Sequence, residues 1–279
     1  MGGRAVLFSP TRFVRRTLKK IDIAITTEKK LQRLKEKSRA GDLVGLLLEL
    51  PQRHKKQLLK YLSSARGQFG QDLFVLSELE FKRDGFFVDF GATDGFHASN
   101  SYLLEKEFGW RGIVAEPARG WHAELKRNRS CSIETNCVWS ESNRELTFVE
   151  AINGDFSTID AFKSVDYHSR ARRNGRKYKV NTISLMDLLK KYNAPQEIDF
   201  LSIDTEGSEF EILNSFDFNR YRFGVITCEH NFSPSREKVS SLLTANGYVR
   251  KFEDFSNVDD WYVSADCNSP KRHTGEKTD

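Results

Sequence analysis

FFVDFGATDG, at residues 86–95, is the stretch that decides the fold of this chain. Its first five residues are aromatic or β-branched except for Asp89, which is typical of a buried strand. Gly91 and Gly95 follow and predict a tight loop, because glycine adopts positive φ angles without a steric cost. Such a loop lets backbone N–H groups face a bound molecule, and Asp89 at the strand end offers a carboxylate to a cation.

The glycine spacing separates two kinds of nucleotide site. A dinucleotide fingerprint, G-x-G-x-x-G, would need glycine at position 93, where the chain has Thr93, and Asp94 would repel a pyrophosphate. The observed pattern is D-x-G-x-x-x-G. It resembles the first motif of class I S-adenosylmethionine (SAM) methyltransferases, whose ligand carries an ammonium and a sulfonium but no phosphate. The alternative is a glycine turn that merely joins a strand to a helix.

Two further residues are candidates for binding the nucleoside. Glu116 ends the strand predicted at 113–115, and an acid at this distance from the glycines holds ribose hydroxyls in nucleotide-binding folds. Asn136, near the end of the next predicted strand, is a candidate for hydrogen bonding to adenine. A structural asparagine at a turn is the alternative for Asn136.

Polar side chains also follow two later apolar runs, at 198–203 and 223–228. Because parallel strands bring their carboxyl ends to one edge of a sheet, we expect these side chains to meet in a crevice. They are the candidate catalytic residues Asp204, Glu206, Glu229 and His230. His230 is the preferred base, since imidazole accepts a proton near neutral pH, with the three carboxylates as rivals and a structural histidine as the alternative.

The same three carboxylates raise the question of a metal. Hard oxygen ligands suit Mg²⁺, which would lower the pKa of an acceptor hydroxyl. Nothing in their spacing demands an ion, and carboxylates that shape the pocket and cap the next helix are the alternative. The sequence therefore assigns no metal ligand.

The composition of the chain indicates the cellular compartment in which the protein is expected. The 279 residues carry a formal charge of +5 and four cysteines without C-x-x-C spacing, which indicates neither a zinc site nor a disulfide framework. Basic residues interrupt every apolar run near the N-terminus, and no stretch has the length of a transmembrane helix. We expect a cytoplasmic protein.

Three regions are expected along the chain: a basic helical appendage at 1–66, a catalytic domain at 67–263 and a disordered polar tail at 264–279. Residues 11–25 have the spacing of a basic amphipathic helix, which could attach to the inner face of a membrane or to nucleic acid. Packing on its own domain or on a second copy in a homodimer is the preferred interpretation.

Basic and aromatic residues mix in the segment Lys163 to Lys179. This composition suits an anionic acceptor, such as a phosphorylated or nucleotide-linked molecule, and a segment ordered by ligand would act as a lid. A solvated loop is the alternative.

Strands alternating with helices from residue 86 to 228 predict an α/β fold with a parallel, doubly wound sheet. The runs at 248–252 and 260–263 predict a closing hairpin at the sheet edge. The expected architecture is a Rossmann-like methyltransferase sandwich, with a mostly parallel seven-stranded sheet and helices on both faces.

Five elements in order resemble the FkbM-type SAM-dependent methyltransferases over about residues 67–263: Gly70-Gln71-Asp72, the 87–95 loop, Ala115-Glu116-Pro117, Ser157-Thr158 and the IDTEGSE run at 203–209. The resemblance implies O-methylation of hydroxyls, often on sugars of surface glycans or on secondary metabolites. It implies that the glycine loop, including Asp89, Gly91, Thr93, Asp94 and Gly95, surrounds the methionine part of SAM. By the same resemblance, Glu116 holds the ribose and Asp204 lies near the sulfonium.

Two other functions compete with this one. An RNA methyltransferase could use the basic segments, but no Asn-Pro-Pro-Tyr-like element follows Asp204, so modification of a base amine is disfavoured and a nucleic-acid partner is not expected. A non-catalytic scaffold would have no need to retain Asp89, Gly91, Gly95 and Glu116 together.

Overall fold

The computed structural model describes residues 41, 43–151, 154, 156–162 and 172–268. The chain divides into two compact units, 1–42 and 43–279, and the second is described below. The helix expected at 11–25 lies outside the described residues, as do residues 163–171 of the basic segment.

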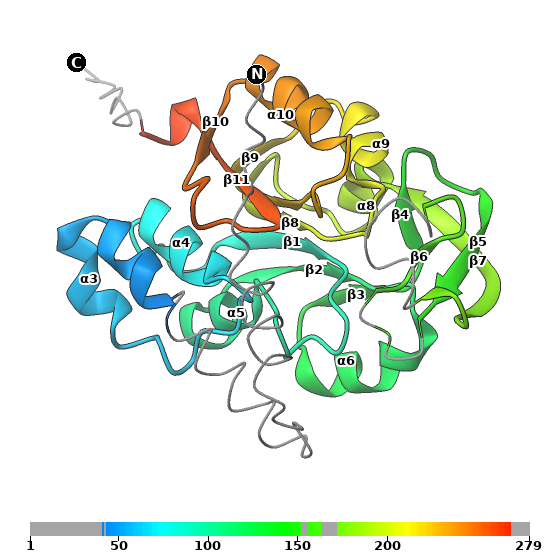
Figure 1. Ribbon diagram of the computed structural model, residues 1–279, viewed down its shortest axis with the longest axis horizontal. Coiled ribbons are helices and arrows are strands. Elements are labelled where there is room, and N and C mark those ends of the chain that lie inside the picture. Colours follow the sequence, from blue (N-terminus) through cyan, green and yellow to red (C-terminus); the bar gives the residue numbers. More distant parts are fainter. Residues whose placement is uncertain (1–40, 42, 152–153, 155, 163–171, 269–279) are drawn as a thin grey trace, which may run out of the picture. The chain divides into compact units, whose positions relative to one another are not determined.

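A seven-stranded sheet forms the centre of the unit, in the order β10-β11-β9-β8-β1-β2-β3 (Figure 1). Neighbouring strands run parallel from β3 to β9, whereas β11 is antiparallel to both β9 and β10. The predicted fold class and closing hairpin are confirmed. The strands are β1 (Phe86–Phe90), β2 (Arg111–Ala115), β3 (Ser132–Glu134), β8 (Glu197–Ile203), β9 (Arg222–Glu229), β10 (Tyr248–Lys251) and β11 (Asp259–Ser264).

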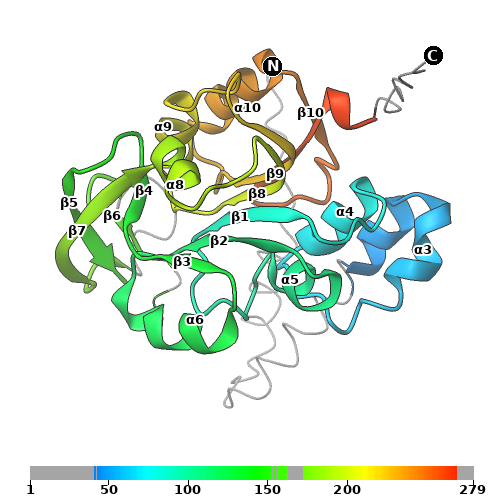
Figure 2. The same cartoon turned by 180° about the vertical axis from the view of Figure 1, so that it is seen from behind.

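Alternation along each strand builds a core on both faces of this sheet, because successive side chains point to opposite faces. In β1, Val88 and Phe90 join one apolar cluster and Phe87 joins the other. The first cluster contains apolar residues of α8 (Leu185–Lys191), α9 (Glu209–Asn214) and α10 (Arg236–Ala245). The second contains those of α4 (Gln71–Glu78), α5 (Tyr102–Phe108) and α6 (His122–Asn128), and Figure 2 shows the sheet between the two sets of helices.

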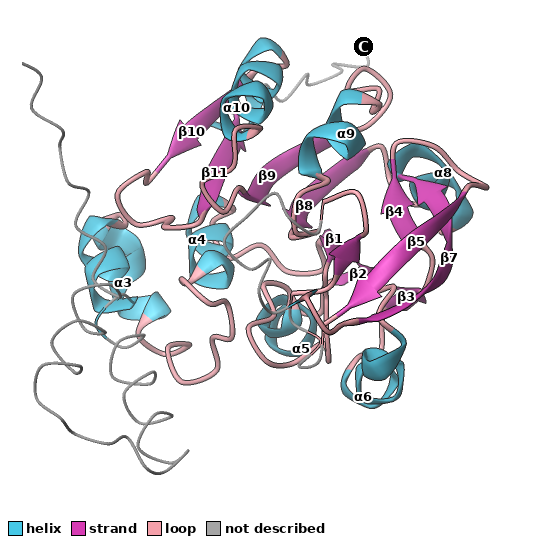
Figure 3. Ribbon diagram, turned by 45° about the vertical axis from the view of Figure 1, so that its right-hand side comes forward, coloured by secondary structure: helices cyan, strands magenta, loops and turns pink. Residues whose placement is uncertain are grey.

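A second, four-stranded sheet lies beside the first, in the order β4-β7-β5-β6 (Figure 3). Its strands are β4 (Cys137–Trp139), β5 (Glu145–Glu150), β6 (Thr158–Ile159) and β7 (Arg176–Ser184). The sequence placed a loop up to Lys179, but β7 already begins at Arg176, where it pairs with Glu150 of β5. Lys177 contacts Asp160 and Lys179 contacts Glu145, so acidic neighbours offset part of the basic charge of this segment.

The compact unit begins at Leu43, upstream of the boundary at residue 67 that the sequence indicated. Residues 43–49 are helical, and Leu43 and Leu46 are buried in the same cluster as α4. A Cβ at Gly70 would lie 2.7 Å from Leu46 and 2.8 Å from Leu43, so the glycine admits both side chains. The short helix α3 (Gln52–Leu58) continues the segment.

Order also extends further at the C-terminal end than expected. Ser264 closes β11 and a 3-10 turn covers Ala265–Asn268, so the predicted tail at 264–279 is wrong over its first residues. Residues 269–279 lie outside the described part of the chain. Among the described residues, no helix combines the length and apolar character needed to cross a membrane.

The packing of residues 43–66 can be tested by a pair of substitutions in one helix. Leu46 is fully buried, whereas Leu48 is 67% exposed. Removing a buried leucine side chain leaves a cavity, so Leu46→Ala should lower the free energy of unfolding by about 2–5 kcal/mol. Leu48→Ala should change it by less than about 0.5 kcal/mol. Urea denaturation of both variants measures this, and equal effects would contradict the assignment of the segment to the domain.

Candidate active site

The loop after β1 passes very close to the loop after β8. Gly91 has a φ of +74°, and a Cβ there would lie 1.9 Å from the carbonyl oxygen of Asp204. The Gly91 N–H also donates to the carbonyl of Ala115 in β2, at 3.0 Å. Only glycine fits this position, since any side chain would separate the two loops.

Glu116, directly after β2, accepts hydrogen bonds from two loops at the edge of the site. Its side chain is buried, and its two carboxylate oxygens accept the N–H groups of Thr93 at 2.8 Å and Ala118 at 2.7 Å. A carboxylate oxygen carries two lone pairs, so it can accept hydrogen bonds from more than one donor. Thr93 itself has a φ of +45°, an uncommon conformation for a non-glycine residue that its bond to Glu116 holds in place.

One pocket joins these elements, and it measures about 590 Å³ up to and including its open mouth. Gly91, Thr93 and Glu116 line one part of it, and Asp204 and Glu206 line another. The second sheet supplies an apolar wall, formed by Cys137, Val138, Phe148 and Ile159. This size and mixture of surfaces suit a nucleoside with space left for a second molecule.

Asp89 is buried behind the glycine loop, where it accepts the hydroxyl of Ser101 at 2.5 Å. Burial raises the pKa of Asp89, and the positive charge of Arg129 opposes that rise. Arg129 is buried too and donates to Ser101 and to Glu105, at 2.9 Å and 2.5 Å. Sequence reasoning did not identify Arg129, because it lies in a polar run without periodicity. The role of Asp89 in binding the cofactor stays a prediction.

Three other candidates for cofactor contact have local structural roles. The carboxylate of Asp94 accepts the N–H groups of Phe96 and His97, each at 2.8 Å, and so turns back into its own loop. Gly95, with a φ of +75°, leaves room for Arg129. Asn136 donates its backbone N–H to Glu134 at 2.9 Å, and it is not among the described residues that line the pocket. A direct contact with adenine from Asn136 is therefore not supported.

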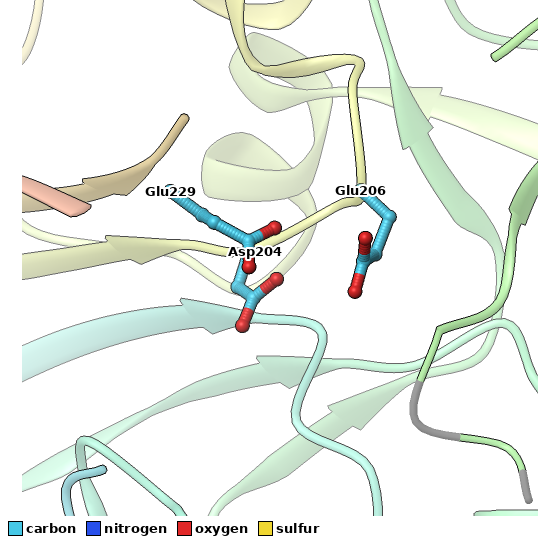
Figure 4. A group of neighbouring side chains, drawn as sticks. All are labelled: Asp204, Glu206 and Glu229. Atoms are coloured by element: carbon cyan, nitrogen blue, oxygen red, sulfur yellow. The ribbon is translucent and has the colours of Figure 1, made fainter. Parts of the chain in front are cut away.

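Asp204, Glu206 and Glu229 come together as the sequence predicted, with one oxygen of each within 4.8 Å of the others. Figure 4 shows them turned toward a common space from the ends of β8 and β9. Burial raises the pKa of Asp204 and, together with the charge of Asp204, that of Glu229. A hydrogen bond joins the two carboxyl groups, which therefore share a proton.

Glu206, the third acid, forms a buried ion pair. Arg172 donates to its carboxylate at 2.6 Å, and both side chains are almost fully buried. Glu206 has a φ of +59°, and Thr158 donates its hydroxyl to the Glu206 carbonyl at 3.0 Å. The Ser157-Thr158 element of the sequence therefore supports the Asp-x-Glu-Gly loop.

His230 has a structural role, and its preference as the catalytic base is wrong on this geometry. Its Nδ1 accepts the N–H of Phe232 at 3.0 Å, and its Nε2 donates to the carbonyl of Asp259 at 3.1 Å. Burial lowers the pKa of His230 to about 4, although Asp260 opposes this. With both ring nitrogens engaged, the imidazole has no lone pair to offer an acceptor hydroxyl.

Comparison with known proteins identifies the family. The family model described as the methyltransferase FkbM domain matches residues 89–268, which include the glycine loop, Glu116 and the acidic cluster. The chain belongs to the FkbM methyltransferase family. This FkbM protein is therefore a SAM-dependent methyltransferase. A curated relative, Methyltransferase sdnD of Sordaria araneosa, is 23% identical over 192 residues, covering 58% of this chain and 73% of that protein.

Solved structures similar to this FkbM methyltransferase are also methyltransferases. The precorrin-6y C5,15-methyltransferase of Geobacter metallireducens is 15% identical with a TM-score of 0.34, covering 64% of this chain and 71% of that one. The human methyltransferase 10 domain containing protein is 15% identical with a TM-score of 0.38, covering 69% and 79%.

The pocket of this FkbM methyltransferase fits SAM. Glu116 offers a carboxylate to a ribose diol, and Val138 and Phe148 offer apolar surface to adenine. The acids beyond Gly91 suit the positive charges of the ligand. When bound, SAM supplies an activated methyl group.

The role of Glu116 can be tested by the conservative change Glu116→Gln. An amide cannot accept on both sides, so either a backbone N–H or a ribose hydroxyl loses its acceptor. Hydrogen bonds to a charged group contribute about 1.5–3 kcal/mol, so the Kd for SAM should rise roughly tenfold to a hundredfold. Calorimetric titration measures this, with Glu124→Gln on the exposed face of α6 as the matched control. Unchanged affinity would exclude Glu116 as a ribose ligand.

The Glu105–Arg129 pair predicts a dependence of stability on pH. Burial favours a higher pKa for Glu105, but the charge and hydrogen bond of Arg129 outweigh it and lower the pKa to about 2, from an ordinary 4.5. The unfolded chain therefore binds the proton first, and the stabilisation present above pH 4.5 is lost as the pH falls toward 2. By pH 3, a shift of this size corresponds to a loss of about 2 kcal/mol.

The matched variant is Glu105→Gln, which cannot titrate. Urea denaturation between pH 6 and pH 3 should show a smaller acid-induced loss of unfolding free energy for this variant than for the wild type. Equal slopes would mean that the pair does not hold the carboxylate in its charged form.

Proposed function

We propose that this protein is an O-methyltransferase that methylates a hydroxyl of a carbohydrate or of a sugar-containing metabolite. The observation that carries the proposal is the convergence of Asp204, Glu206 and Glu229 on a pocket also lined by the glycine loop. Carboxylates are strong acceptors for the hydroxyl groups of a polyol, and they can take up the proton that a methylated hydroxyl must lose.

The charge of the pocket argues against a polyanionic acceptor. Asp204, Glu206 and Glu116 line it, and like charges repel the phosphates of nucleic acid. On β7, Lys177 and Lys179 contact Asp160 and Glu145. An acceptor with neutral hydroxyls is therefore favoured over RNA.

Asp204 is the proposed proton acceptor. Its carboxyl shares a proton with Glu229, and Glu229 carries that proton because their hydrogen bond lowers the pKa of Asp204 and raises the pKa of Glu229. Asp204 is thus the charged partner that can hold the acceptor hydroxyl. As the methyl carbon leaves sulfur and bonds to the acceptor oxygen, the hydroxyl proton passes to the Asp204 carboxylate, directly or through one water.

The experiment incubates the full chain with methyl-labelled SAM and three classes of acceptor: monosaccharides, nucleotide sugars and single-stranded RNA. Mass spectrometry should place the label on a sugar hydroxyl, and the deoxy analogue lacking that hydroxyl should remain unlabelled. Asp204→Asn should lower kcat by about a hundredfold or more, because it removes the proton acceptor.

Two results would contradict this assignment. Label on RNA instead of sugars would replace the acceptor class. An Asp204→Asn variant with undiminished kcat would exclude Asp204 as the base. Glu124→Gln serves as the control, since that exposed side chain pairs with Arg127 on α6.

A further inference from the structure

The acidic cluster has the dimensions of a cation site. Asp204 and Glu206 lie in the loop after β8, and Glu229 ends β9. One oxygen of each lies within 4.8 Å of the others. Two ligands on opposite sides of an octahedral Mg²⁺ stand about 4.2 Å apart, given bonds of about 2.1 Å. Neighbouring ligands of the same ion stand about 3.0 Å apart, so side-chain shifts of up to about 1–2 Å would bring these three oxygens onto one ion.

A buried amide beside the cluster points to the same conclusion. Asn231 is only 7% exposed, and its Nδ2 donates to the Glu206 carboxylate at 3.2 Å, so the side chain is aimed at the acids. Its Oδ1 is buried and has no hydrogen-bond partner among the described residues. Buried polar atoms are almost always satisfied, so this oxygen calls for a partner that the described residues do not supply. An amide oxygen is a ligand for small divalent cations.

The backbone holds this amide in place. Asn231 has a φ of +43°, and both it and His230 donate their N–H groups to the carbonyl of Val258. The ring of His230 is fixed between Phe232 and Asp259 by hydrogen bonds at both nitrogens. A conformation this uncommon for a non-glycine residue persists only where its surroundings hold it, which is typical of functional positions.

Charge gives a third reason. Three carboxylates meet beside the pocket, Glu206 among them is buried, and Arg172 contacts Glu206. Buried like charges are costly unless a cation or a proton compensates them. A divalent ion would compensate the charges of Asp204 and Glu229.

We propose that Asp204, Glu206, Glu229 and Asn231 form a binding site for one small divalent cation, Mg²⁺ or Mn²⁺. The site lies where the acceptor is proposed to bind, so the ion holds the acceptor hydroxyl as a ligand and makes its proton more acidic. The proton passes to the second carboxylate oxygen of Asp204. This role rests on the proposed O-methylation, whereas binding of the ion stands independently of it.

The test titrates Mn²⁺ into the full chain and follows the free ion by electron paramagnetic resonance. We expect one ion per chain, displaced by Mg²⁺. Affinity should fall roughly tenfold or more in Glu229→Gln and in Asp204→Asn. It should be retained or increased in Asn231→Asp, which keeps an oxygen at the ligand position and tolerates the positive φ. Glu124→Gln should bind Mn²⁺ as the wild type does.

Binding is measured without turnover, so failure of this inference is distinct from failure of the proposed function. No bound Mn²⁺, or binding that survives both Glu229→Gln and Asp204→Asn, overturns the metal site. Methyl transfer to a sugar hydroxyl that continues undiminished in EDTA overturns the role of the ion and leaves the O-methyltransferase intact. Mn²⁺ bound at these residues without transfer to any hydroxyl supports the site and counts against the proposed function.

Discussion

The approach of Gly91 to the carbonyl of Asp204 is the constraint on which the site depends. Strands β1 and β8 are parallel neighbours, with Phe90 opposite Ile203, so the loops that follow them leave the sheet side by side. A Cβ at position 91 would lie 1.9 Å from the Asp204 oxygen and would force them apart. Because Gly91 has no side chain, the glycine loop lies directly against the acidic cluster. Transfer between two bound molecules needs this proximity, because their reacting atoms must come within van der Waals contact.

Two buried arginines from distant segments of the chain compensate the negative charge of the acids around the site. Arg129, which follows α6, forms an ion pair with Glu105, and its charge opposes the rise in the pKa of Asp89. Arg172 forms an ion pair with Glu206. Burying a charge without a partner would cost several kcal/mol, so each arginine supports a loop that could not otherwise fold around its acid. Asp204 and Glu229 instead share a proton. The charge of Glu105 and Glu206 is thus compensated by an arginine, whereas that of Asp204 and Glu229 is compensated by a proton.

His230 illustrates how a residue with the right intrinsic chemistry can serve architecture instead. Its ring joins the end of β9 to β11 by donating to the Asp259 carbonyl, and it accepts the Phe232 N–H. Asp259 in turn accepts the side-chain N–H of Gln71, at the start of α4, at 2.7 Å. The Gly-Gln-Asp element and the histidine are thus parts of one buried network that fixes the rear of the site.

The sequence by itself determined the sheet, its closing hairpin, the glycine loop and the convergence of the acids, because strand periodicity and the position of polar residues at strand ends are local signals. It did not determine that the Asp94 carboxylate turns back into its own loop, that β7 begins at Arg176, or that residues 43–66 belong to the core. Nor could it reveal that Arg129 and Arg172 neutralise buried acids, or that His230 has no free nitrogen. Those properties depend on contacts between residues far apart in the chain, and only tertiary packing creates such contacts and the burial that changes the pKa of each group.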